Sequence, residues 1–93
     1  MLNAKGNDPA SIAQGNVISG IGTLIKVYWF NPAAVGDTFT LVDATKGVLI
    51  LTGRCEAANQ SQLFDQSNGL SATTFNGLGC SQLTSGTLYV TIA

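Results

Sequence analysis

The 93-residue chain contains no histidine, and only 10% of its residues are charged, against about 25% in ordinary globular domains. Histidine is the commonest general base and a frequent metal ligand, so its absence removes the usual centre of a hydrolytic or metal site. The four basic and five acidic residues are spread singly along the chain. No basic patch could therefore neutralise several phosphates, and we expect no nucleic-acid partner.

Long hydrophobic runs are also missing. The longest run, Val48 to Leu51, is far shorter than the roughly 18 to 20 residues of a membrane span. The first 16 residues carry one lysine and no apolar core, unlike a signal peptide. We therefore expect no membrane partner, and synthesis and assembly in a cytoplasm.

Cysteine is scarce, with Cys55 and Cys80 standing 25 residues apart and no CxxC pair. This spacing does not suit zinc, and two cysteines in a cytosolic product are more often buried free thiols than a disulfide. No basic residue is placed to activate Cys55 as a nucleophile. Cysteines in strands also generally lie in the core, so we do not expect Cys55 to be reactive.

The carboxylates offer little chemistry either. Four of them could pair or hold calcium: Asp37, Asp43, Glu56 and Asp65. They lie singly at loop edges without EF-hand spacing, so we expect them to cap turns rather than to bind calcium. We predict that the protein is not an enzyme and holds no cofactor or metal.

What the chain has in abundance is neutral polar and apolar residues, the latter at 45%. Contact regions between proteins are depleted of Lys, Glu and Asp, so this composition is typical of a surface covered by neighbours. It is equally compatible with a small β domain that has a neutral surface.

The strongest structural signal is the stretch Ile21 to Phe30, which is rich in β-branched and aromatic residues and predicts a strand. Strict alternation would place Ile25, Val27 and Trp29 in the core. The opposite face would carry Leu24, Lys26, Tyr28 and Phe30, which are only partly polar, so a second layer or a partner subunit is expected to cover it.

Further strands follow at intervals of about ten residues. Thr38 to Cys55 predicts a hairpin with Phe39 and Leu41 inward, 73–83 predicts a strand with a bulge or close approach at its glycines, and 87–92 alternates regularly. We predict an all-β fold, a small antiparallel β-sandwich or barrel of five to six strands with an extended N-terminal arm. The arm would span 1–20 and the domain 21–93.

The arm has few apolar anchors. It is either an untethered terminus or a segment that lies along a neighbouring subunit, with Ile12 and Val17 as its contact residues. The aromatic residues also leave two possibilities open. Trp29, Tyr28 and Tyr89 could form a face for sugar rings, or Trp29 is core and the tyrosines lie at a subunit contact.

Strand and turn residues alternate along the second part of the chain, in 22–32, 36–38, 56–61, 76–78 and the closing 85–90. In these stretches, and from about residue 20 to the end, the chain resembles a group of small proteins encoded among the structural genes of tailed bacteriophages. The resemblance implies a β domain built into the virion as a capsid decoration or cement protein, with a tail or fibre position as the alternative. It brings no functional residues with it.

The resemblance and composition together predict a non-enzymatic protein on the capsid surface that binds the major capsid protein and copies of itself. Closed symmetric oligomers are the common way to cover such a face, so a trimer or dimer is expected. The predicted interface residues are Ile12, Val17, Tyr28, Phe30 and Tyr89.

Overall fold

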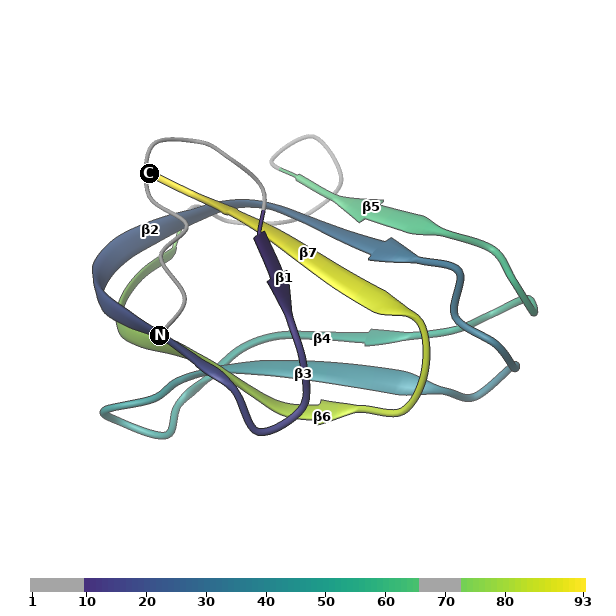
Figure 1. The fold of residues 1–93 in the computed structure, drawn as a ribbon, viewed down its shortest axis with the longest axis horizontal. Helices are drawn as coiled ribbons and strands as arrows, with labels where there is room; N and C mark the ends of the chain where they lie inside the picture. The colour runs from purple at the N-terminus through teal and green to yellow at the C-terminus, as the bar shows by residue number, and fades with distance from the viewer. Residues whose placement is uncertain (1–9, 66–72) are drawn as a thin grey trace.

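The computed structural model describes residues 10–65 and 73–93, and these form antiparallel strands without any helix (Figure 1). The all-β antiparallel prediction is confirmed. Seven strands are present in the described residues, one or two more than expected: β1 (Ala10–Ile12), β2 (Val17–Phe30), β3 (Thr38–Asp43), β4 (Leu49–Arg54), β5 (Gln62–Phe64), β6 (Thr73–Leu83) and β7 (Thr87–Ile92). Their order in the sheet is β1-β7-β2-β6-β3-β4, and β5 pairs with β2 beside this path.

Two long strands, β2 and β6, hold the sheet together. The first half of β2 pairs with β6, whereas its second half lies between β7 and β5. The second half of β6 turns to pair with β3. The sheet consequently bends over on itself into two layers, and Figure 1 shows β2 curving around one end of the molecule between them.

Aromatic side chains pack between the two layers. The ring of Phe39 from β3 meets Trp29 of β2 and Phe64 of β5 edge to face, with centroids 5.0 and 5.4 Å apart. Trp29 and Phe39 are fully buried. Edge-to-face pairs of this kind stabilise beyond the area they bury, so this contact fixes how the layers sit on each other.

The predicted alternation of β2 is wrong in its first part. Leu24 is buried completely, whereas Ile25 is only partly buried. The pairing with β7 shifts register between Leu24 and Lys26, which leaves Ile25 as an extra residue in the strand. Such a β-bulge reverses the phase of the side chains, so Leu24 joins the same core as Val27.

The described part of the predicted arm, residues 10–20, belongs to the sheet. Ala10–Ile12 pairs with β7, and β2 already begins at Val17. Ile12 is 2% exposed and lies in the chain's own core, so it is not a free contact residue. Residues 1–9 of the predicted arm lie outside the described residues, as do residues 66–72.

The predicted hairpin and closing strand are confirmed. β3 and β4 pair antiparallel, with Phe39 and Leu41 fully buried, and β7 buries Leu88 and Val90. The predicted irregularity of β6 is also present. The register between β6 and β2 shifts at Gly77, which has a φ of 81° and lies opposite the segment between Ile18 and Ile21.

Candidate interaction surface

An exposed row of apolar side chains crosses the outer side of the layer formed by β5, β2 and β7. Leu63 pairs with Tyr28, and Tyr28 pairs with Tyr89, so the three lie side by side on neighbouring strands. Phe30 stands two residues further along β2 on the same side. We call these four residues, Tyr28, Phe30, Leu63 and Tyr89, the aromatic face.

Strand alternation places these rings outside. Trp29, Leu88 and Val90 point inward and are fully buried, so their neighbours along β2 and β7 must point outward. The ring of Tyr28 lies 6.2 Å from that of Phe30 and 6.5 Å from that of Tyr89, the latter pair at an interplanar angle of 27°. Mutual stacking therefore holds the rings as one surface.

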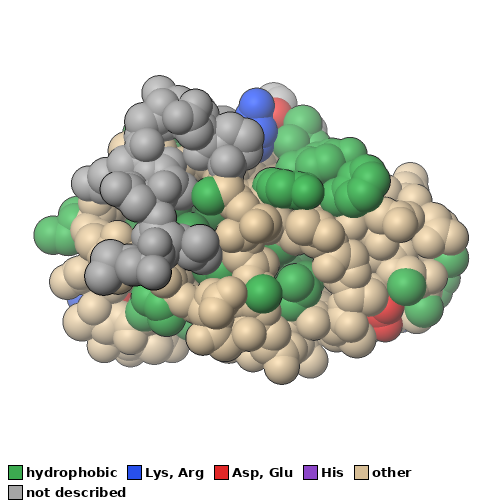
Figure 2. All heavy atoms as spheres, viewed as in Figure 1, with side chains coloured by type: hydrophobic (Ala, Val, Ile, Leu, Met, Phe, Trp, Pro, Cys, Tyr) green, Lys and Arg blue, Asp and Glu red, His purple; other side chains and the backbone are tan. Residues whose placement is uncertain are grey.

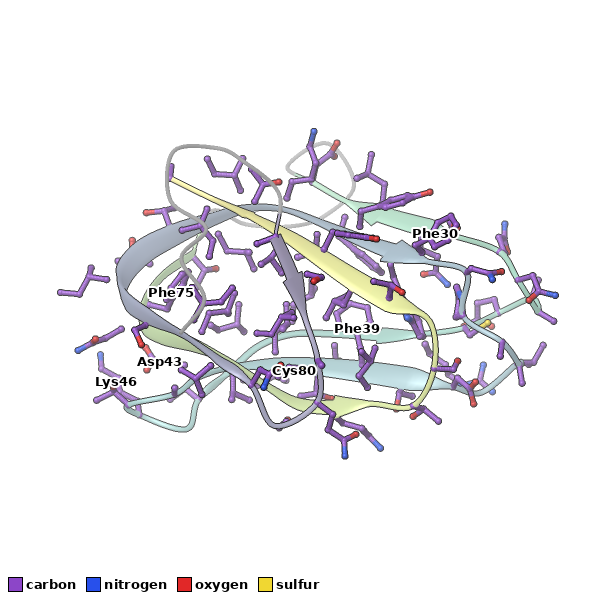
Figure 3. All side chains as sticks on the ribbon, in the orientation of Figure 1. Phe30, Phe39, Asp43, Lys46, Phe75 and Cys80 are labelled. Carbon is purple, nitrogen blue, oxygen red and sulfur yellow. The ribbon has the colours of Figure 1, made fainter. Side chains whose placement is uncertain are left out.

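The exposed fractions on the aromatic face run from 36% for Tyr89 to 48% for Phe30. Hydrophobic side chains gather over β5 and the end of β2 in Figure 2, and Figure 3 places Phe30 there, outside the ribbon. Aromatic side chains bury about 150–250 Å² each when fully covered. At these exposures the face offers roughly 300 Å², the size of the larger patches on monomeric proteins, which are often functional.

Hydrogen bonds to Ser85 fix the backbone at the end of the aromatic face where Phe30 lies. Trp29 Nε1 donates to the Ser85 carbonyl at 2.9 Å, and the Ala33 amide donates to Ser85 Oγ at 2.8 Å. Ser85 Oγ in turn donates to the Asp37 carboxylate. The following Gly86 has a φ of 76°, and a Cβ there would lie 2.7 Å from the Phe30 carbonyl oxygen, so this turn requires glycine.

The predicted interface residues thus separate. Tyr28, Phe30 and Tyr89 come together on the aromatic face, Val17 is 45% exposed elsewhere on the surface, and Ile12 is core. Sequence reasoning missed Leu63, whose place depends on the register between β5 and β2 rather than on its own neighbours in the chain. Trp29 is buried, as the subunit-contact alternative expects, and the sugar-binding alternative loses its largest ring.

The most constrained carboxylate is Asp43, at the end of β3 (Figure 3). Its Oδ1 accepts the amides of Thr45 and Lys46, and its Oδ2 accepts the amide of Asn76 on β6. These donors, Lys46 first, hold the pKa of Asp43 below its ordinary value, against the opposing effect of desolvation. Asp43 therefore ties the β3–β4 turn to β6, the structural capping role expected for it.

The two cysteines are buried and free. Cys55 Sγ lies 3.1 Å from the Ala57 carbonyl oxygen, and Cys80 Sγ lies 3.3 Å from that of Gln82. Burial raises the pKa of the Cys80 thiol, which disfavours the reactive thiolate.

Within residues 10–65 and 73–93, no three His, Cys, Asp or Glu side chains gather closely enough to hold a metal ion. The same part of the chain contains no helix able to span a membrane. No family model matches the sequence, and neither a curated protein nor a solved structure matches it.

Proposed function

We propose that this protein is a non-enzymatic structural component of a bacteriophage virion, a decoration or cement protein on the capsid surface that binds the major capsid protein and copies of itself. The observation that carries the binding role is the aromatic face. Tyrosine and phenylalanine are enriched in the centres of protein interfaces because they offer large areas at little cost in conformational entropy.

Two further features support the assignment to a particle. The sequence resembles small structural proteins of tailed phages, as described above. In addition, only 10% of the residues are charged, and the ion pair between Arg54 Nη1 and Glu56 Oε2, 3.1 Å apart, is itself exposed. A neutral surface with an apolar centre suits a protein that is packed among neighbours.

The alternative is a tail or fibre component that binds carbohydrate or another receptor. Tyr28 and Tyr89, stacked and exposed, are the rings that such a role would use. Glycan binding that disappears in Tyr89→Ala, while circular dichroism shows an intact fold, would favour this alternative over the capsid role.

The capsid role is tested by mixing the purified protein with empty shells assembled from the major capsid protein of the same phage. Pelleting of the shells should carry the protein down at a saturable ratio. Phe30→Ser, on the aromatic face, should pellet less with the shells, and Val35→Ser serves as its matched control, since Val35 is exposed but lies outside the aromatic face. A protein that stays in the supernatant at every shell concentration, and is missing from purified particles, would refute the role.

A further inference from the structure

β4 forms the longest open edge of the sheet in the described part of the chain. Three strands have a single neighbour there: β1, β4 and β5. β1 and β5 have three residues each, whereas β4 has six. Proteins commonly protect an edge by keeping it short, or by placing charges or prolines along it. The segment from Val48 to Gly53 contains neither, and Val48 and Leu49 are each 57% exposed.

The hydrogen bonds at one end of the β3–β4 hairpin show that the backbone of Thr52 faces outward. The Cys55 amide donates to the Asp37 carbonyl at 2.7 Å. Bonded and non-bonded pairs alternate along an antiparallel ladder, so Arg54 and Thr52 fall at non-bonded positions and direct their N–H and C=O groups away from β3. The Arg54 carbonyl supports this direction, because it accepts a hydrogen bond from Gln62 Nε2 of β5 at 3.1 Å.

Leu49 faces outward as well, but a β-bulge changes its spacing from Thr52. At the other end of the hairpin the Asp43 amide donates to the Val48 carbonyl at 2.9 Å, so the next position, Leu49, is non-bonded. The register against β3 shifts between these two ends and leaves Ile50 as an extra residue. The outward backbone groups of β4 therefore lie three residues apart, instead of two as in a regular strand.

This spacing decides which strand can pair with the edge. A regular strand presents its bonding groups two residues apart, so it could match one of the two outward positions and not the other. A second β4 that runs antiparallel has the same irregular spacing. Leu49 of each copy then lies opposite Thr52 of the other copy, with the two bulges facing each other. The edge is therefore complementary to itself.

We propose that two copies pair through β4, antiparallel about a two-fold axis, with Leu49 of each copy opposite Thr52 of the other. Main-chain hydrogen bonds at these positions hold the pair. Both copies use the same patch, so the contact forms a closed dimer and not a chain, and it uses no residue of the aromatic face. This inference rests on the proposed binding between copies and specifies how two copies meet.

Disulfide cross-linking between two variants with one added cysteine each tests the register. Leu49→Cys and Thr52→Cys are purified separately, mixed at micromolar concentration and exposed to a mild oxidant. In the proposed pair, positions 49 and 52 of different copies have Cα atoms about 5.5 Å apart, which suits a disulfide. Position 49 of one copy lies about 10 Å along the strand from position 49 of the other, which is too far.

The mixture should therefore give a covalent dimer with one copy of each variant on a non-reducing gel, whereas each variant alone should stay monomeric there. The native cysteines are both buried, so they should not contribute. Val35→Cys mixed with Leu49→Cys is the control, because Val35 is exposed to a similar extent, 59% against 57% for Leu49, but does not belong to β4.

A second experiment removes one outward N–H from the edge. Thr52→Pro loses that group without breaking the ladder to β3, and Thr52→Val keeps it. Both variants lose the hydrogen bond from Thr52 Oγ1 to the Phe39 carbonyl at 3.0 Å, so they differ at the edge. In sedimentation velocity Thr52→Pro should associate at least about tenfold more weakly than Thr52→Val, and circular dichroism confirms that each variant folds.

Three results would overturn the inference. These are an unmodified chain that stays monomeric over the whole concentration series, a folded Thr52→Pro that associates like Thr52→Val, or a mixture of the two cysteine variants that gives no more covalent dimer than each variant alone. Because no capsid shell is present, none of these results bears on shell binding. Failure of the shells to carry the protein down would in turn leave these tests unaffected.

Discussion

Gly53 in β4 lies directly opposite Phe39 in β3, and the Phe39 ring lies across it. A Cβ at Gly53 would overlap that ring. Because Phe39 is fully buried between Trp29 and Phe64, the ring has no room to move away. We therefore expect Gly53→Ala to destabilise the protein even though it adds only one methyl group.

The magnitude follows from two opposing effects. Overpacking costs about 1–3 kcal/mol, and replacing a strand glycine by alanine returns about 0.5–1 kcal/mol. Gly53→Ala should thus lower the free energy of unfolding by about 1–2 kcal/mol. Phe39→Leu loses two aromatic contacts of about 0.5–1.5 kcal/mol each, but it also removes the ring that the Cβ of Gly53→Ala would overlap. The double variant should be more stable than the sum of the single effects by about 1–2 kcal/mol.

Urea unfolding of the four proteins, followed by tryptophan fluorescence, measures this coupling. A change of 1 kcal/mol corresponds to a shift of about 4–8 °C in Tm for a domain of this size. Gly79→Ala is the matched control, since a Cβ there has room and should be neutral or slightly stabilising. If the effects of Gly53→Ala and Phe39→Leu add within about 0.5 kcal/mol, the packing described here is wrong.

Three further predictions concern two polar contacts and the burial of a cysteine. Because the folded state lowers the pKa of Asp43, its stabilising contribution is complete above the unfolded pKa of about 3.9 and is lost as the pH falls through the folded value. Asp43→Asn should therefore flatten the acid decline of Tm; an unchanged decline would contradict the role of this carboxylate. Trp29→Phe leaves the Ser85 carbonyl without its donor and should cost about 1–3 kcal/mol in urea unfolding, and no loss would contradict that bond. Cys80, which is 2% exposed, should react with a thiol reagent only in denaturant, whereas rapid labelling of the native protein would show that it is accessible.

Local patterns in the sequence were sufficient for much of the fold. The hairpin of β3 and β4 and the alternation of β7 follow from neighbouring residues, because a strand with one buried face must alternate. The exposure of Tyr28, Phe30 and Tyr89 followed from the same rule, and the structure brings these three predicted residues onto one face.

The remaining features depend on pairing between distant segments. The bulge at Ile25 is set by the register of β2 against β7, and nothing in the residues beside Ile25 marks it. Ile12 is buried because β1 pairs with β7, almost eighty positions away along the chain. The placement of Val17 and Val42 on either side of Gly79 likewise appears only when β2 and β3 pair with β6, so the sequence could not reveal it.

The central claim is that the aromatic face is covered when the protein works. Hydroxyl-radical footprinting of the protein, free in solution and again within assembled particles, tests this at single side chains. We expect Tyr28, Phe30 and Tyr89 to be oxidised more slowly in the particle, with the exposed Val35 unchanged. Equal oxidation of these three rings in both states would contradict the claim.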